Sequence, residues 1–88
     1  MRDYIVSGAM VIAIAGREKG ESFIVLETQN DYAYIINGKT RTINSPKKKK
    51  IKHLQLLCKS ELVNLDMNTL TDALVKKYLD NYNKSRVK

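Results

Sequence analysis

A run of four lysines, Lys47 to Lys50, is the part of this sequence whose residue types could do chemistry. It follows Pro46 and leads into Ile51-Lys52-His53-Leu54. Clustered ammonium groups attract polyanions, because each phosphate that they neutralise releases a condensed counterion whatever the base sequence. Pro46 fixes its own φ and favours extended geometry at Ser45, so the lysines leave it in a partly predetermined direction. This stretch predicts a basic arm that is held by a folded body.

The positive charge is concentrated in the middle third of the 88-residue chain. Residues 32–60 contain eight lysines or arginines and no aspartate or glutamate. Residues 1–31 carry three basic and five acidic side chains, and residues 61–88 carry five basic and four acidic ones. The three blocks therefore have net charges of −2, +8 and +1, which account for the net charge of +7. This asymmetry predicts a polyanionic partner for the middle third.

Length and composition limit the classes of protein that this chain can belong to. Its 88 residues provide one domain with a modest core, and 43% hydrophobic and 28% charged residues are typical of a folded protein rather than a disordered basic tail. Cys58 is the only cysteine, which excludes an internal disulfide and fits a reducing, cytoplasmic compartment. His53 is the only histidine, so a structural zinc site lacks ligands. We expect no metal and no other cofactor.

The sequence does not predict an enzyme. It has no paired-carboxylate site and no Ser/His/Asp or Cys/His set at a plausible spacing. Cys58 and His53 are five residues apart, which places them on opposite faces of a strand. The segment from Gly16 to Gly20 does not match the nucleotide-binding glycine patterns.

Neither secretion nor membrane insertion is expected. The apolar run 9–15 ends in a small-x-small pattern like that of a signal-peptidase site. However, it has only the minimum length for the apolar region of a signal peptide, and Arg2 is followed at once by Asp3. No stretch is long enough to span a bilayer.

Five short strands are predicted before residue 58, because runs rich in β-branched and aromatic residues alternate with turn residues. These strands are residues 9–15, 22–28, 32–36, 39–43 and 51–57. Asn37-Gly38 predicts a type I′ hairpin turn between the third strand and the fourth. Lys39 and Arg41 would then share one face of the fourth strand. Five strands joined by tight turns predict a small barrel, because closure removes exposed edges.

A change in composition after Cys58 divides the chain into a barrel, residues 1–58, and a C-terminal part, residues 59–88. Thr69-Leu70-Thr71-Asp72 has the form of a capping box. Apolar residues then recur at four-residue spacing up to Tyr82, so we expect an amphipathic helix over about 69–82. Its apolar stripe is expected to pack on the barrel, and binding of a partner protein through this helix is the alternative.

Two motifs taken together resemble the bacterial KOW-domain RNA-binding proteins, which are similar to KOW-containing proteins of the archaeal and eukaryotic large ribosomal subunit. The first is the loop Gly16-Arg17-Glu18-Lys19-Gly20 after an apolar strand, and the second is the stretch from Pro46 to Leu54. Asn37-Gly38-Lys39-Thr40-Arg41 lies between them. The resemblance covers roughly residues 9–56 and implies an SH3-like barrel that binds RNA through the loop after the first strand and adjacent basic residues. Family members often have Asp in place of Glu18 and Asn37, a difference that we expect to matter little.

The loop and the basic motifs supply the candidate RNA-binding residues. These are Arg17, Lys19, Gly20, Lys39, Arg41, Lys47, Lys48, Lys49, Lys50, Lys52 and His53. The cations would contact phosphates of structured RNA, and the backbone of the glycine-bounded loop would approach the RNA closely. His53 and Tyr32 or Tyr34 could also stack on an unpaired base, although packing is the commoner role of such residues.

Three hypotheses for the function follow. The leading one is a non-catalytic RNA-binding protein associated with the ribosome and hence with translation. The second is a protein-interaction module that uses an SH3-like barrel and the helix at 69–82. The third, ranked lowest, takes residues 46–52 as a nuclear localisation signal or a DNA-binding arm.

Overall fold

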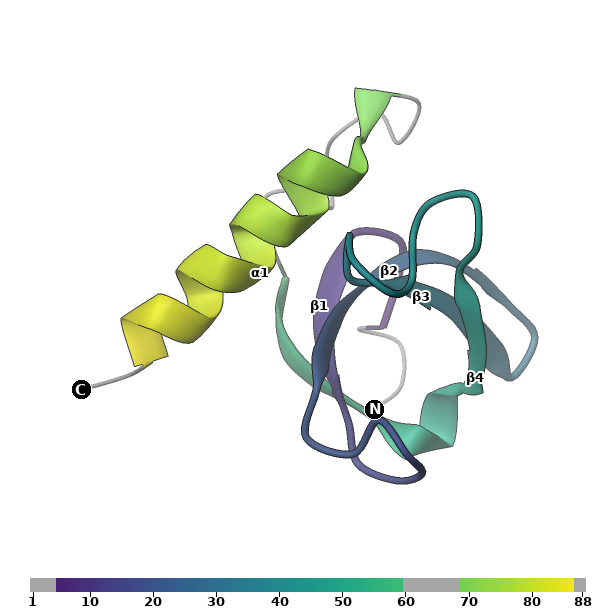
Figure 1. The fold of residues 1–88 in the computed structure, drawn as a ribbon. Coiled ribbons are helices and arrows are strands. Elements are labelled where there is room, and N and C mark those ends of the chain that lie inside the picture. Colours follow the sequence, from purple (N-terminus) through teal and green to yellow (C-terminus); the bar gives the residue numbers. More distant parts are fainter. Residues whose placement is uncertain (1–4, 60–68, 87–88) are drawn as a thin grey trace.

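The protein is described here from a computed structural model, which defines residues 5–59 and 69–86. This part of the chain is mainly β, with one antiparallel sheet of five strands that curls into a half-barrel and one C-terminal helix (Figure 1). The elements are β1 (Ala9–Ala13), β2 (Ser22–Gln29), β3 (Tyr32–Ile36), β4 (Lys47–Lys50), the one-turn 3₁₀ helix η2 (Ile51–His53), β5 (Leu54–Lys59) and α1 (Asp72–Arg86). The strand order is β4-β3-β2-β1-β5. Within the described residues, no helix is long and apolar enough to cross a membrane.

The curl of the sheet has a local cause. The register shifts between Val25 and Glu27 where β2 pairs with β3, and between Met10 and Val11 where β1 pairs with β5. Such bulges bend a strand and increase its twist. The sheet therefore wraps around one of its faces instead of remaining open and flat.

The concave face of the sheet holds the larger apolar cluster. Phe23, Val25 and Ile35 are fully buried there, and Ile51 of η2 and Leu54 of β5 complete the cluster. η2 joins the two edge strands β4 and β5, so the cluster includes residues from the connection between the edges. Alternate residues of the same strands face the other way.

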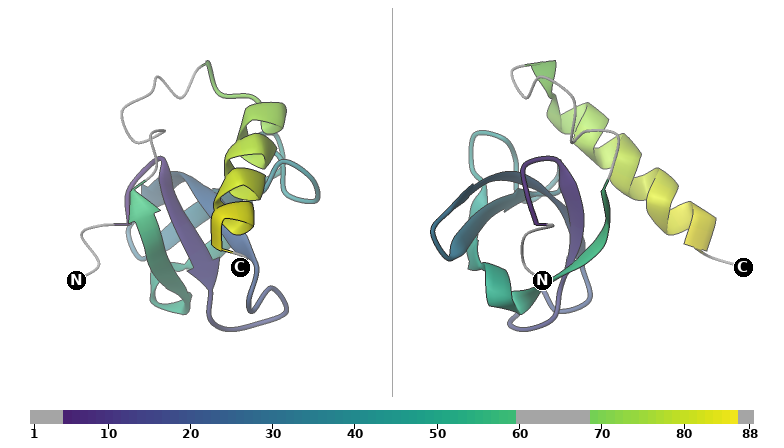
Figure 2. Two further views of the ribbon diagram at one scale, coloured as in Figure 1. Left: turned by 90° about the vertical axis from the view of Figure 1, so that its left-hand side faces the viewer. Right: turned by 180° about the vertical axis from the view of Figure 1, so that it is seen from behind.

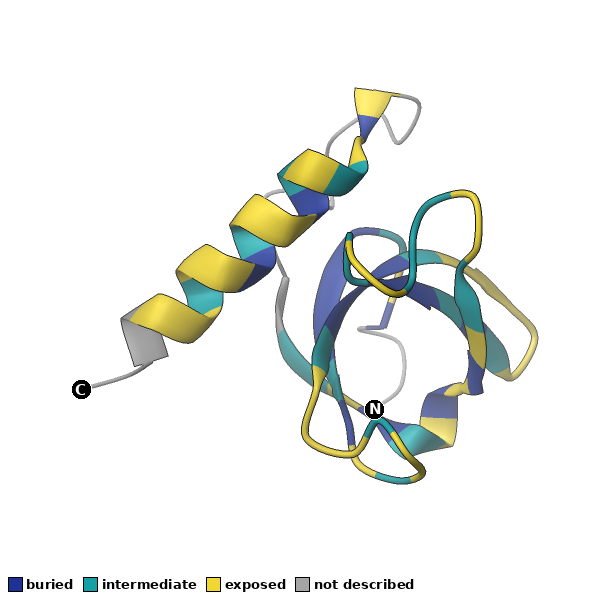
Figure 3. Ribbon diagram, in the orientation of Figure 1, coloured by how far each residue is buried: buried dark blue, intermediate teal, exposed yellow. Residues whose placement is uncertain are grey.

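The convex face of the sheet is covered by α1, which lies outside the curled strands in all three views (Figures 1 and 2). Ile24 and Ile36 are fully buried in a second cluster with Val75 and Leu79 of the helix. Buried residues of α1 lie on the face turned toward the sheet, and the opposite face is exposed (Figure 3). The apolar stripe of the helix therefore packs on the sheet.

The helix begins three residues later than the sequence predicted. Thr71 is the N-cap, since its Oγ1 accepts a hydrogen bond from the backbone N–H of Leu74 at 3.2 Å. Asp72, at the first helical position, uses Oδ1 to accept a hydrogen bond from the backbone N–H of Ile43 at 2.9 Å. The first turn of α1 is thus attached to the loop that follows β3.

The predicted fourth strand is wrong. Residues 39–43 form a loop with a single bridge, between Thr42 and Ser45, and the lysine run itself is β4. Oδ1 of Asn37 accepts hydrogen bonds from the backbone N–H groups of Lys39 (2.9 Å) and Arg41 (3.0 Å), so those groups cannot join a ladder. The predicted type I′ turn also fails, because Asn37 does not have the positive φ that it requires.

Gly38 allows this loop to contact the helix. Its φ is +80°, and a Cβ placed on it would lie 2.5 Å from the backbone oxygen of Asp72. Only glycine combines that backbone conformation with so close an approach. The loop from Asn37 to Ser45 is therefore held between β3 and α1, and it returns the chain to the sheet at Lys47.

Candidate nucleic-acid interface

Each lysine of β4 has a fixed neighbour on β3. The pairs are Ile35 with Lys47, Tyr34 with Lys48, Ala33 with Lys49 and Tyr32 with Lys50. Since side chains alternate along a strand, Lys47 and Lys49 lie on the concave side with Ile35 and Ala33, and Lys48 and Lys50 lie on the convex side with the two tyrosines. Lys49 is only 8% exposed, whereas Lys48 and Lys50 are exposed. The lysine run is therefore a strand of the sheet with two different faces, and not the arm that the sequence predicted.

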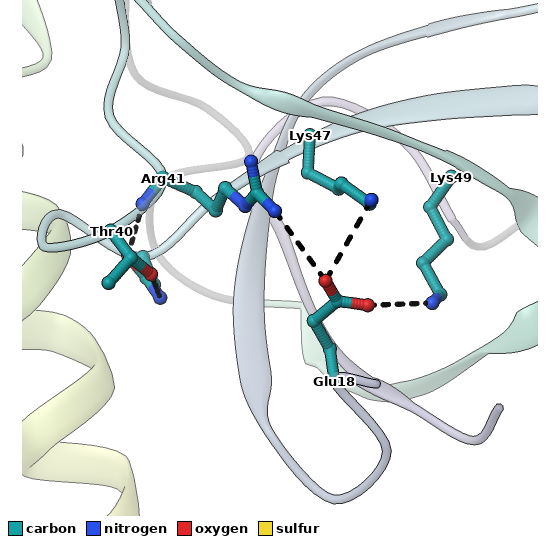
Figure 4. Close-up of polar contacts among 6 residues, drawn as sticks. Glu18, Thr40, Arg41, Lys47 and Lys49 are labelled. Carbon is teal, nitrogen blue, oxygen red and sulfur yellow. Dashed lines mark hydrogen bonds and ion pairs between the residues drawn. The ribbon is translucent and has the colours of Figure 1, made fainter. Parts of the chain in front are cut away.

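Glu18 binds the cations of the concave side. Its Oε1 accepts a hydrogen bond from Lys49 Nζ at 3.1 Å, and its Oε2 lies 3.6 Å from Arg41 Nη2 and 3.8 Å from Lys47 Nζ. The three side chains converge on this one carboxylate (Figure 4). Glu18 is 14% exposed, whereas the side chains of Arg41 and Lys47 are 38% and 36% exposed, so the cluster lies at the rim of the half-barrel. It connects the β1–β2 loop to the edge strand β4.

The hydrogen bond from Lys49 is the main cause that holds the pKa of Glu18 below its usual value. Burial acts in the opposite direction, and a backbone hydrogen bond together with the charges of Lys49 and Lys47 adds to the lowering. Glu18 is therefore ionised at neutral pH. Its negative charge partly cancels the field of the three cations around it.

The glycine-bounded loop between β1 and β2 places Glu18 in this position. The backbone N–H of Lys19 donates to the Gly16 oxygen, and that of Glu21 donates to the Glu18 oxygen at 2.8 Å. Gly16 has a φ of +83°, and a Cβ there would lie 2.8 Å from Lys49 Nζ. Glycine at this position thus provides the turn and leaves room for the ammonium group.

The other cations of the predicted site are exposed, and within the described residues none of them forms an ion pair. They are Arg17 and Lys19 in the β1–β2 loop, Lys39 in the loop after β3, Lys48 and Lys50 of β4, and Lys52 of η2. The ammonium of Lys48 lies over the ring of Tyr32, 4.5 Å from its centroid. Most of the unpaired positive charge is on β4 and η2 and in the β1–β2 loop.

Two contacts bring the β1–β2 loop to β4 and η2. The backbone N–H of Ile14 donates to the oxygen of His53 at 2.9 Å, and Glu18 contacts Lys49. The exposed cations of the loop and of η2 therefore lie at the same end of the sheet. Lys39 is set apart from them, in the loop that Gly38 and Asp72 attach to the helix.

The structure divides the predicted site residues into groups. Arg41, Lys47 and Lys49 surround Glu18, and the six other cations are exposed. Gly20 is exposed with a φ of +93°, and His53 is half-buried in η2.

Sequence reasoning missed the role of Glu18; we expected only that Asp in its place would matter little. A signal was present in the sequence. A strand of consecutive lysines next to a buried strand must turn half of them toward the core, and buried cations need a carboxylate.

A scan of the sequence against protein-family models gave no match, and a search of curated proteins also gave none. The resemblance to KOW-domain proteins therefore stays a prediction.

Proposed function

We propose that this chain is a non-catalytic RNA-binding protein, associated with the ribosome, whose half-barrel is an SH3-like barrel of the KOW type. The observation that carries the proposal is the separation of its cations into two sets. One set surrounds Glu18, and the other set, on β4, η2 and the β1–β2 loop, is exposed without ion pairs among the described residues. Exposed cations gathered on rigid elements next to one another fit a phosphate backbone.

Phosphate contacts would come from Lys48, Lys50 and Lys52 and from Arg17 and Lys19 in the loop. A-form helices hide their base edges in a deep groove, so such a surface recognises RNA by shape and by the spacing of phosphates. If these five cations each neutralise one phosphate, log affinity should fall against log salt concentration with a slope of about −3.5 to −4.5. Arg41 and Lys47 can contribute less, because Glu18 competes with phosphate for them.

The arrangement of the strands supports the fold type in this proposal. Five antiparallel strands curl around one core, and the short η2 brings the edge strands β4 and β5 together. The β1–β2 loop, to which the KOW resemblance assigns RNA binding, adjoins the basic strand through Glu18 and Lys49.

The protein-interaction alternative depended on an exposed helix stripe. Leu70 is buried, and Leu74 and Tyr78 are partly buried in the cluster between α1 and the sheet. The described part of the stripe therefore packs within the chain, which does not favour that alternative.

The test compares two double variants that remove the same charge. Lys48→Ala with Lys50→Ala removes the two convex-side lysines of β4. Lys76→Ala with Lys77→Ala removes two exposed lysines of α1. The wild-type protein and both variants are sedimented with separated ribosomal subunits at low and at high salt. We expect salt-sensitive binding to one subunit, weakened about 15- to 30-fold at roughly 0.15 M salt in the β4 variant and little changed in the α1 variant.

Two results would contradict the proposal. If the wild-type protein stays in the supernatant at low salt, it does not bind ribosomal RNA in this way. If both variants lose binding equally, net charge alone drives the association, and the β4 surface has no special part in it.

A further inference from the structure

A hollow beside Tyr32 adds a more specific site to this basic surface. It has a volume of about 320 Å³ and is lined by Asp31, Tyr32, Lys50 and Lys52. We propose that the hollow binds one unpaired nucleotide of an RNA strand, with its base stacked on the Tyr32 ring and its flanking phosphates on Lys50 and Lys52. This inference rests on the proposed RNA-binding function and deepens it.

The position of the ring is set by its neighbours on both sides. Tyr32 is the first residue of β3, paired with Gln29 of β2 and with Lys50 of β4. Lys48 approaches the ring to 4.5 Å from its centroid, and such a cation over an aromatic face is attracted by the ring quadrupole. The Tyr32 ring therefore lies next to the side chains of Lys48 and Lys50.

The walls of the hollow are also fixed to each other. The β2–β3 turn consists of two residues, with Asn30 at a φ of +56°. The oxygen of Asp31 in this turn accepts a hydrogen bond from the backbone N–H of Ile51 at 2.8 Å. This bond connects the turn to η2, which carries Lys52, so little ordering is needed when a ligand binds.

The chemistry of the lining fits a nucleotide better than a bare phosphate. The Asp31 carboxylate forms no ion pair within the described residues, and it would repel a phosphate placed against it. A base offers a π-face for Tyr32 and N–H donors for a carboxylate, and its flanking phosphates suit the two lysines. The base must be unpaired, because a duplex stacks its base faces against one another.

The experiment measures the affinity of the full chain for two fluorescently labelled RNA probes at one salt concentration. One probe is a single-stranded octanucleotide, and the other is the same strand annealed to its complement. The variants are Tyr32→Ala, Tyr32→Phe and, as a matched control, Tyr34→Ala, which removes the neighbouring tyrosine of the same strand face. Thermal unfolding of each variant shows whether it is folded.

We expect Tyr32→Ala to weaken binding of the single strand about 5- to 150-fold, since this is the range for loss of one stacked base. Binding of the duplex should change less than about twofold. Tyr32→Phe keeps the ring and should keep the affinity for the single strand, and Tyr34→Ala should also keep it.

A second measurement does not depend on how a variant folds. The wild-type protein is given a probe whose bases are replaced by abasic sites, which has the same backbone charge, and its affinity should fall by a similar factor. The inference is overturned if the abasic probe binds as well as the normal strand, or if Tyr32→Ala leaves the affinity for the single strand unchanged. If neither probe binds the wild-type protein at low salt, the RNA-binding function fails together with this site.

Discussion

The two faces of β4 carry the same residue type and have opposite environments. Lys49 is buried against Glu18 on the concave side, and Lys48 and Lys50 are exposed on the convex side next to tyrosines. Neighbours along the chain are thus separated by the pleat of the strand. The number of lysines in a run therefore overstates the charge that a partner can reach.

The lysines on the concave side of β4 connect this strand to the β1–β2 loop. Edge strands leave backbone groups unpaired, and β4 is an edge strand of this sheet. At the rim, Lys47 and Lys49 contact Glu18 from the β1–β2 loop, so ion pairs hold together two segments that no strand pairing connects. On β4, therefore, the concave side contributes to the fold, and the lysines of the convex side stay exposed.

The largest expected effect comes from Glu18→Gln, which removes the carboxylate and leaves the buried Lys49 ammonium unpaired. Removing one partner of a fully buried pair is strongly destabilising, and this pair is at the rim, so we expect a loss of about 1–3 kcal/mol in the free energy of unfolding. The melting temperature should fall by roughly 5–20 °C in thermal unfolding followed by circular dichroism.

Glu21→Gln is the matched control for this variant, because Glu21 is an exposed glutamate three residues away without an ion pair in the described part of the chain. It should change stability by less than about 0.5 kcal/mol. If both variants melt at the same temperature, the cluster around Glu18 does not stabilise the fold.

The next effect is the pH dependence of the stability that the Glu18 carboxylate contributes. The hydrogen bond from Lys49 lowers the pKa of Glu18 in the folded state, so the folded protein binds fewer protons at this site than the unfolded chain. The contribution is present in full above the usual glutamate value of about 4.3, and it is lost as the pH falls through the folded-state value. The difference in melting temperature between wild type and Glu18→Gln should therefore shrink from pH 7 to pH 3. A difference that stays constant to pH 3 would assign the loss to packing instead of charge.

Much of the fold could be predicted from the sequence, because local patterns determine it. The mainly β fold with five strands and a C-terminal helix is confirmed, and β3 has the predicted bounds. The error at residues 39–43 arises because the Asn37 side chain takes up backbone N–H groups that a strand would need. The lysine run forms a strand through its pairing with β3, a tertiary effect that outweighs the weak strand propensity of lysine.

The sequence predicts which residue types form the candidate site, but it does not predict how they are arranged in space. Which lysines face the core depends on the register with β3, and shifting the register by one residue would exchange the two faces. Glu18 is 31 residues from Lys49 in sequence, so their hydrogen bond exists only once the sheet has curled. Asp31 and Tyr32 meet Lys50 and Lys52 through the pairing of β3 with β4 and the hydrogen bond from the backbone N–H of Ile51 to the Asp31 oxygen, which are also tertiary contacts.

The smallest expected effect, and the sharpest comparison of the two faces, comes from Lys49→Met and Lys48→Met. Methionine replaces the buried ammonium with apolar volume, and Glu18 keeps Arg41 and Lys47, so Lys49→Met should change the free energy of unfolding by no more than about 1 kcal/mol. It should leave RNA affinity nearly unchanged, since the Lys49 ammonium is already paired with Glu18.

Lys48→Met removes the same charge from the convex side of β4 and should weaken RNA binding about four- to sixfold at roughly 0.15 M salt, with little change in stability. The measurement is the affinity of both variants for one RNA, obtained by titration. An equal loss of affinity would mean that phosphate displaces Glu18 from Lys49 and that RNA reaches both faces of β4.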